Sequence, residues 1–197
     1  MQTIYDNHLI DTTSLGENPI FVDTGACFGA CIDWALSNLN QPKVYAIEPC
    51  KTHISTLENK FNNIQIYWAA LVGNDFCGDS VQFNEFIGLP KWGQIAALDK
   101  SRAKSAATYK KLKGIENYKV PVIRIGELFN RLEIKKIDYL KMDIEGTEEE
   151  VIRDIDTVAP FISQMSIEIH SDSKIKEKLV KLGYKVTVIK NEVHAIR

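Results

Sequence analysis

Short apolar runs alternate with helical patterns along most of this chain, and this alternation constrains the fold more than any other feature. Residues 20–23, 44–47 and 64–71 are predicted to be buried strands, and the apolar residues between them recur at helical spacing. Strands separated by helices form βαβ units, in which the strands run parallel and the helices cover both faces of the sheet. The sequence therefore predicts an α/β fold built on a mostly parallel sheet.

The same alternation continues in the last third of the chain. Residues 137–144 and 161–170 are predicted to be two further strands of the sheet. Between them, Thr147 and Glu150 have the T-x-x-E spacing of a capping box, which is typical of a helix start. Another strand–helix–strand unit is therefore expected here.

The C-terminal end of the chain follows a different pattern. Two apolar segments, 184–190 and 192–197, are joined by a very short turn at Asn191. Parallel strands need a crossover of a dozen or more residues, so these two can only form an antiparallel hairpin. The mostly parallel sheet is therefore predicted to finish in a C-terminal antiparallel hairpin.

The length of the chain, 197 residues, is enough for one domain with a full core. We expect a single domain over residues 1–197, in which residues 1–18 form an N-terminal extension. Residues 86–119 interrupt the alternation and carry eight basic residues against two acids. This segment is expected to be a basic insertion, either a solvated helix or a flap that contacts an anionic substrate.

The composition excludes several classes of protein. The balance of 24 basic against 26 acidic residues argues against a dedicated nucleic-acid binder. No run approaches the ~20 apolar residues of a membrane span, and the N-terminus lacks the pattern of a signal peptide. The four cysteines contain no CxxC pair and the four histidines are scattered, so we expect free thiols and no metal site. A cytoplasmic protein that does not act at a membrane is expected.

The loop after the first predicted strand contains two glycines, Gly25 and Gly29. Ligands of open α/β sheets bind beyond the carboxyl ends of the strands, and glycine permits close backbone approach just ahead of a helix. The G-x-x-x-G spacing differs from the G-x-G-x-x-G of dinucleotide-binding turns, which disfavours a pyrophosphate site. The loop is either a plain strand-to-helix turn or part of a cofactor site.

Glu48 ends the second predicted strand. An acid at this position can accept hydrogen bonds from both hydroxyls of a ribose, as in Rossmann-type sites. By itself it could equally be a surface residue before Pro49. Because the glycine loop ends the preceding strand, we favour the ribose site.

Three charged residues, Lys141, Asp143 and Glu145, lie in or just after the predicted strand 137–144. Strand alternation places all three on one side. A charge inside a central parallel strand is costly unless it is paired, so Lys141 and Asp143 indicate a functional site. Glu145 could also be an ordinary helix-entry residue.

The next predicted strand has a polar face that includes Glu168 and His170. If the two strands are neighbours with level ends, Lys141 pairs with Glu168 and Asp143 with His170. A buried ion pair beneath an Asp–His pair would form a supported catalytic site. His170 could also be a strand-end histidine that lies half in solvent.

Together, these segments resemble the FkbM-type S-adenosylmethionine-dependent methyltransferases, a branch of the Rossmann-like class I methyltransferases. The most specific match is DYLKMDIEGTEEEVI, which follows the family signature D-x-x-K-x-D-x-E-G-x-E and includes Glu148. FVDTGACFG is similar to the family pattern V-D-x-G-A-N-x-G, with Cys27 where the family usually has Asn. The other matching segments are VYAIEP, AALVGND and VPVIRIGELF.

The resemblance implies a seven-stranded sheet that binds S-adenosylmethionine and transfers its methyl group to a hydroxyl oxygen. Family members act on varied acceptors, often sugars or natural-product hydroxyls, so a small-molecule or glycan acceptor is expected. The implied cofactor-binding residues are Asp23, Gly25, Ala26, Cys27, Gly29, Glu48, Pro49, Ala70 and Asp143. The implied catalytic residues are Asp143, His170, Glu145 and Lys141.

The implied reaction leaves the general base open. An alcohol must lose its proton as it attacks the methyl group, and Asp143 or His170 could accept that proton. Asp143 and Glu145 could instead hold a divalent cation, although two carboxylates are few for Mg²⁺. Two other functions stay open, a nicotinamide-dependent oxidoreductase and a catalytically silent binding module with a methyltransferase-like fold.

Overall fold

A seven-stranded sheet forms the centre of the computed structural model, which describes residues 2–5, 8–87, 113–169 and 174–197. Its strands are β3 (Ile20–Thr24), β4 (Lys43–Glu48), β5 (Gln65–Trp68), β9 (Ile137–Met142), β10 (Ile162–Glu168), β11 (Lys185–Ile189) and β12 (Glu192–Ile196). Their order in the sheet is β11-β12-β10-β9-β3-β4-β5, and the five strands from β10 to β5 run parallel. The prediction of an α/β fold on a mostly parallel sheet is confirmed.

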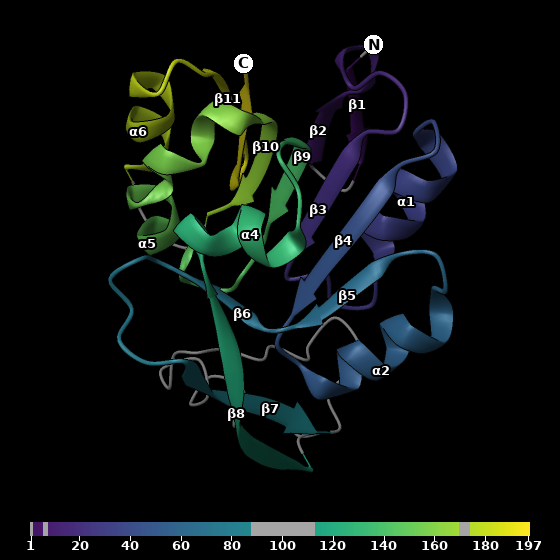
Figure 1. Ribbon diagram of the computed structural model, residues 1–197, viewed down its shortest axis with the longest axis vertical. Helices are drawn as coiled ribbons and strands as arrows, with labels where there is room; N and C mark the ends of the chain where they lie inside the picture. Colours follow the sequence, from purple (N-terminus) through teal and green to yellow (C-terminus); the bar gives the residue numbers. More distant parts are fainter. Residues whose placement is uncertain (1, 6–7, 88–112, 170–173) are drawn as a thin grey trace.

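Helices cover both faces of this sheet (Figure 1). They are α1 (Ala30–Asn38), α2 (Lys51–Lys60), α4 (Leu128–Leu132), α5 (Glu148–Arg153) and α6 (Ile175–Lys181). One apolar cluster joins α1 and α2 to the sheet, and another joins α4, α5 and α6 to its opposite face. Neighbouring strand residues divide between the two, with Phe21 and Tyr139 in the first cluster and Val22 and Leu140 in the second.

The predicted C-terminal hairpin is confirmed. Strands β11 and β12 pair antiparallel, with Val188 opposite Val193. Strand β12 also pairs antiparallel with β10, so the hairpin extends the parallel part of the sheet beyond β10. Val193 is fully buried on β12, whereas Val188 on the outermost strand is exposed.

The predicted capping box before α5 is wrong. Thr147 is the N-cap residue, but its side chain makes no capping hydrogen bond. The carboxylate of Glu148 instead accepts hydrogen bonds from the backbone N–H groups of Ile144 (3.2 Å) and Gly146 (3.0 Å). The turn is therefore tied by the first residue of the helix, and the predicted partner Glu150 is exposed.

The segment predicted as one strand over residues 64–71 is divided between two sheets. Strand β5 belongs to the central sheet, whereas β6 (Ala70–Val72) pairs with a strand of a separate three-stranded sheet. The break falls at Ala69, whose backbone N–H donates to the carbonyl of Glu48 at 3.3 Å. The prediction of a single continuous strand is therefore wrong.

The predicted basic insertion, residues 86–119, begins and ends in an antiparallel pair. This pair is formed by β7 (Ser80–Ile87) and β8 (Gly114–Arg124), which lie at the bottom of Figure 1. Phe83 of β7 is buried, and β8 continues upward to pair with β6. Residues 88–112 lie outside the described residues, so the predicted flap stays a prediction.

The predicted N-terminal extension packs against the sheet through its second strand. Strands β1 (Gln2–Tyr5) and β2 (His8–Asp11) form an antiparallel hairpin. The N–H of Leu9 donates to Nδ1 of His194, and the N–H of Asp11 donates to Oε1 of Gln164, both at 3.0 Å. Contacts to β10 and β12 therefore hold β2 against the sheet.

Candidate active site

The carboxyl ends of β3, β4 and β9 meet at one edge of the sheet. Strand β3 lies between the other two, with Thr24 level with Ile47 and Met142. Beyond the strands, the N–H of Asp143 donates to the carbonyl of Thr24 (3.0 Å), and the N–H of Gly25 donates to that of Ile47 (2.9 Å). The three loops that follow these strands are therefore neighbours.

Both glycines of the first loop are required by its geometry. Gly25 has a φ of +74°, and a Cβ there would lie 1.7 Å from the carbonyl oxygen of Asp143. Gly29 has a φ of +75°, and a Cβ there would lie 2.4 Å from the ring of Phe61. A side chain at either position would therefore clash and also strain the backbone.

Lys141 forms the centre of a buried charged cluster. Its Nζ lies 3.3 Å from Oδ1 of Asp23 and 3.7 Å from Oδ2 of Asp143, and it donates to the carbonyl of Gly25 at 2.8 Å. Burial of the amine disfavours its charged form, but the charges of Asp23 and Asp143 outweigh that cost and raise the pKa of Lys141 above its usual value. Lys141 is therefore a permanent cation in this cluster.

The predicted pairing of Lys141 with Glu168 is wrong. Strands β9 and β10 are neighbours, but their register places Lys141 opposite Ser166 rather than Glu168. Glu168 instead accepts a hydrogen bond from Nδ2 of Asn191 at 2.6 Å. The two strands do not end level, which shifts the expected partners by two residues. His170 lies outside the described residues, so its predicted pairing with Asp143 stays a prediction.

Glu145 does not continue the strand alternation that was predicted for it. Strand β9 ends at Met142, and Glu145 has a left-handed φ of +59° in the turn that leads to α5. The neighbouring Glu148 is 3% exposed and ties this turn through its carboxylate. In the sequence, the signal for this role of Glu148 was its match to the family signature, because the T-x-x-E spacing indicated Glu150 instead.

Glu48 is almost completely buried, with 4% of its surface exposed. Its Oε1 accepts hydrogen bonds from the N–H of Cys50 (2.8 Å) and from Nδ1 of His53 (3.1 Å). Its Oε2 accepts a hydrogen bond from the N–H of Cys27 at 2.8 Å. Glu48 therefore joins the glycine loop to the start of α2 and is not a surface residue.

His53 is a member of this edge that sequence reasoning missed. It lies on the first turn of α2, and its Nε2 is 3.9 Å from Sγ of Cys27. The ring of Phe28 meets the imidazole edge-on at 4.4 Å between centroids. The only signal in the sequence was its position five residues after Glu48, which by itself does not separate it from the other scattered histidines.

The surroundings of His53 favour its protonated form. Burial of the imidazole opposes protonation, but hydrogen bonds with Cys27, Cys50 and Glu48, together with the charge of Glu48, outweigh this and raise the pKa of His53 to about 12. His53 also interacts electrostatically with Glu85, a buried residue of β7. His53 is therefore expected to be a cation at neutral pH.

We expect the free energy of unfolding to decrease as the pH rises above about 6.5, the ordinary pKa of histidine. A group whose pKa is raised by folding stabilises fully below its unfolded pKa, and this contribution is lost as the pH rises toward its folded pKa. From pH 7 to pH 9 the contribution of His53 should fall by about 1–3 kcal/mol. Urea denaturation of wild type and His53→Gln across this range measures it, and equal pH slopes would contradict the assignment.

The remaining predicted cofactor residues lie around the same edge. Ala26 is buried in the glycine loop, and Pro49 is half-buried directly after β4. The carbonyl of Pro49 accepts a hydrogen bond from Nε1 of the exposed Trp68 at 2.9 Å. Ala70 is buried at the start of β6. Sequence-predicted residues from four different segments are therefore close to this edge.

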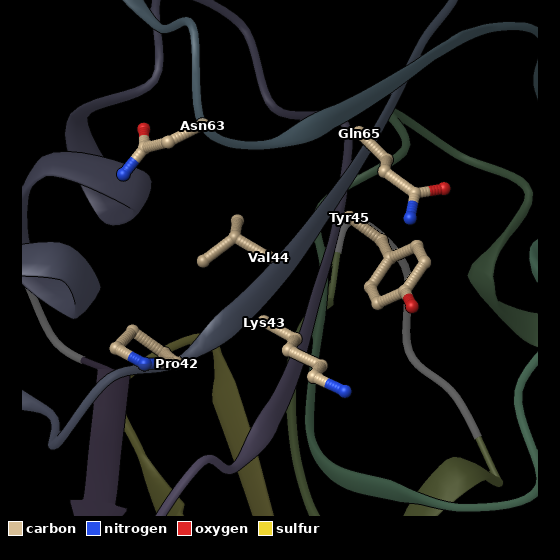
Figure 2. A pocket seen from close by; sticks show the side chains of 6 residues that line it. All are labelled: Pro42, Lys43, Val44, Tyr45, Asn63 and Gln65. Carbon is tan, nitrogen blue, oxygen red and sulfur yellow. The ribbon is translucent and has the colours of Figure 1, made fainter.

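A hollow on the surface lies away from this edge. It is found at the amino-terminal starts of β4 and β5, opposite to the end of β4 that carries Glu48 (Figure 2). Its lining residues are Pro42, Lys43, Val44, Tyr45, Asn63 and Gln65. Ligands of open α/β sheets bind at the carboxyl ends of the strands, whereas this hollow lies at the amino-terminal ends. Its lining residues also form no cluster of catalytic groups, so we assign it no part in the site.

Comparison with known proteins points to one class of enzyme. A family model described as the methyltransferase FkbM domain matches residues 23–186. A curated protein, methyltransferase sdnD from Sordaria araneosa, is 23% identical over 172 residues, which cover 78% of this chain and 66% of that protein. The chain thus spans slightly less than two thirds of the length of this relative.

Among solved structures, the chain is similar to a precorrin-6y C5,15-methyltransferase from Geobacter metallireducens. The TM-score is 0.50 at 12% identity, and the match covers 93% of this chain and 82% of the other. At this identity the likeness concerns the fold, a Rossmann-like α/β architecture. Within the described residues, no helix combines the length and the apolar character that crossing a membrane requires.

Proposed function

The chain belongs to the family of FkbM methyltransferase domains, and we propose that it transfers a methyl group from S-adenosylmethionine to a hydroxyl oxygen of a small-molecule or glycan acceptor. One observation carries this proposal. The glycine loop, the carboxylate of Glu48 and the Lys141 cluster come together at the carboxyl edge of a parallel sheet. Open α/β sheets bind their ligands at this edge.

The donor set at this edge fits the cofactor. Oε2 of Glu48 accepts one hydrogen bond from the described residues, so a lone pair is left to accept from a ribose hydroxyl. The loop at Gly25 would face the methionine part, and Gly25 has no side chain that could block its approach. Asp23 lies just before that loop. The other residues proposed to flank the cofactor are Ala26, Cys27, Gly29, Pro49 and Ala70.

The acidic side chains of the site also suit this cofactor. The carboxylates of Asp23 and Asp143 lie 3.3 and 3.7 Å from Nζ of Lys141. Carboxyl groups attract a positive charge on a ligand, and they do so more strongly where water is excluded. The cationic sulfur of the cofactor is therefore compatible with this edge.

When bound, the cofactor supplies a methyl group on a cationic sulfur. A hydroxyl acceptor must lose its proton as it attacks, which requires a base at the mouth of the site. The side chain of Asp143 is 26% exposed just beyond β9, and we assign it as the proton acceptor, with His170 as the second candidate. Much of the rate of an in-line displacement comes from positioning the two reactants.

Lys141 is a positioning residue in this mechanism. Its single ammonium group holds the carbonyl of Gly25, the carboxylate of Asp23 and the carboxylate of Asp143 in fixed relation. The loop that faces the cofactor and the proposed base are therefore oriented by the same side chain. We assign no separate chemical step to Glu145, which lies in the turn ahead of α5.

Glu48→Gln should weaken the binding of S-adenosylmethionine by about 1.5–3 kcal/mol, the range for losing a hydrogen bond to a charged group. Isothermal titration calorimetry measures this loss. Glu58→Gln on the exposed side of α2 is the matched control and should bind as tightly as wild type. Thermal unfolding of each variant is recorded alongside, because Glu48 also holds the loop through Cys27.

Unchanged affinity in Glu48→Gln would remove Glu48 from the ribose site. If wild type binds neither S-adenosylmethionine nor its demethylated product, the proposal itself fails. Titration with NAD and NADP under the same conditions tests the oxidoreductase alternative. Saturable binding of a nicotinamide cofactor in place of S-adenosylmethionine would favour that alternative.

A further inference from the structure

Cys27, His53 and Glu48 form a chain of functional groups, and the proposed methyl transfer uses neither the thiol of Cys27 nor the imidazole of His53. Sγ of Cys27 lies 3.9 Å from Nε2 of His53, and Nδ1 of the same ring lies 3.1 Å from Oε1 of Glu48. A thiol next to an imidazole that a carboxylate orients is the arrangement that activates sulfur nucleophiles. The three groups come from the glycine loop, the first turn of α2 and the end of β4.

The orientation of His53 fits this role. The buried carboxylate of Glu48 accepts the Nδ1–H of the ring at 3.1 Å, which leaves Nε2 facing the sulfur of Cys27. A proton on Nε2 can then be donated toward the sulfur. The thiolate is the reactive form of cysteine, and an imidazolium neighbour is typical of reactive cysteines.

Cys27 is also reachable, unlike two of the other cysteines. It is partly exposed in the loop, whereas Cys31 and Cys50 are buried. Its backbone has a left-handed φ of +51°, which is uncommon for a residue with a side chain. Cys77 is exposed but has no imidazole partner among the described residues, and its thiol donates to the carbonyl of Asp75.

We propose that Cys27 is a modification site, a nucleophilic thiol that reacts with alkylating electrophiles and with peroxides. In alkylation by iodoacetamide, the sulfur forms a bond to the methylene carbon, the carbon–iodine bond breaks, and iodide leaves. With hydrogen peroxide, the sulfur bonds one oxygen and the O–O bond breaks, which oxidises the thiolate to a sulfenic acid. The departing hydroxide takes a proton from His53 and leaves as water, so the peroxide is reduced by two electrons.

The position of this thiol connects its modification to the proposed function. The N–H of Cys27 donates to Glu48, the residue proposed to bind the ribose. A group added to Sγ would fill space beside that carboxylate, so modified protein should no longer bind the cofactor, and bound cofactor should shield the thiol. This last step rests on the proposed function, whereas the reactivity of Cys27 does not.

The test compares the alkylation rates of individual cysteines within one protein. Wild type is treated with iodoacetamide at pH 7.5, and peptide mass spectrometry follows each cysteine with time. EDTA is present throughout, because Glu48, Cys50 and His53 also place donor atoms within 4.8 Å of one another and could hold a cation. Cys27 should react at least about 10-fold faster than Cys77, although Cys77 is the more exposed. A rate equal to or below that of Cys77 would overturn the proposal.

His53→Gln tests the source of the reactivity. The variant should slow alkylation of Cys27 by about 10-fold or more and leave the rate of Cys77 unchanged. Ser55→Ala, at an exposed position of the same helix, should match wild type at both cysteines. An unchanged rate at Cys27 in folded His53→Gln would overturn the role of the imidazole. If this variant unfolds, the wild-type ratio of the two rates still decides whether Cys27 is reactive.

A final arm separates this proposal from the proposed function. S-adenosylhomocysteine, the demethylated cofactor, should protect Cys27 from iodoacetamide and leave Cys77 unprotected. Fast alkylation that the ligand does not slow would support the reactive thiol and contradict the proposed position of the cofactor. Slow alkylation together with tight ligand binding would overturn the reactive thiol and leave the proposed function intact.

Discussion

Lys141→Met is expected to lower the free energy of unfolding by about 3–5 kcal/mol, the cost of breaking a buried ion pair on one side only. The substitution removes the ammonium group that faces the fully buried carboxylate of Asp23 at 3.3 Å. A methionine has nearly the same length, so the loss reports the charge and not the packing. Urea denaturation of the variant measures it, with the exposed Lys185→Met as control.

The double variant Asp23→Asn, Lys141→Met tests whether the two charges are coupled. Removing both charges leaves no uncompensated ion at the fully buried position of Asp23, so the double variant should be more stable than the sum of the single losses predicts. The coupling is expected to exceed about 1 kcal/mol for groups in direct contact. Strictly additive losses would show that the ion pair contributes nothing, in spite of its geometry. Glu168→Leu should show no coupling to Lys141, because Glu168 binds Asn191 instead.

Asp143→Asn should lower kcat by about 10²–10⁴-fold, the usual contribution of a positioned base. The amide keeps the shape of the side chain but cannot accept the proton of the attacking hydroxyl. The loss should appear in kcat measured with saturating cofactor and an acceptor that wild type methylates. Glu149→Gln, an exposed residue on the adjacent helix, should retain wild-type turnover. Near-normal turnover in Asp143→Asn would move the role of base to His170 or to water.

Much of the fold could be predicted from the sequence because it depends on local patterns. Apolar runs of four to eight residues, separated by segments with helical spacing, predict βαβ units whatever the individual side chains are. The hairpin at residues 184–197 could be predicted because the turn at Asn191 is too short to connect parallel strands. The break at Ala69 could not be predicted, because the apolar run continues through it and only the contact with Glu48 shows where the chain changes sheets.

The structure brings the predicted residues Lys141 and Asp143 together, but not in the predicted pairing. Lys141 and Asp143 were recognisable because charges inside a buried strand need partners. Their partner could not be identified, since the sequence does not give the register between β9 and its neighbours. The structure gives Asp23 on the strand to one side, whereas Glu168 on the other side was predicted.

His53 shows a second limit of sequence reasoning. No sequence pattern distinguishes a functional histidine on the first turn of a helix from any other, and the role of His53 depends on two other segments of the chain. Glu48 and Cys27 approach it only because α2 begins directly after β4 and the glycine loop lies on the neighbouring strand. Such a cluster is a property of the topology, which no spacing along the chain reveals.

The most direct test of the proposed function is a crystal structure of the protein with S-adenosylhomocysteine. The proposed function predicts density for the ligand at the carboxyl edge of β3, β4 and β9, with its ribose hydroxyls within hydrogen-bond distance of Glu48 and its amino-acid part along the loop at Gly25. Ligand density at another edge of the sheet, or at the hollow near Lys43, would contradict it.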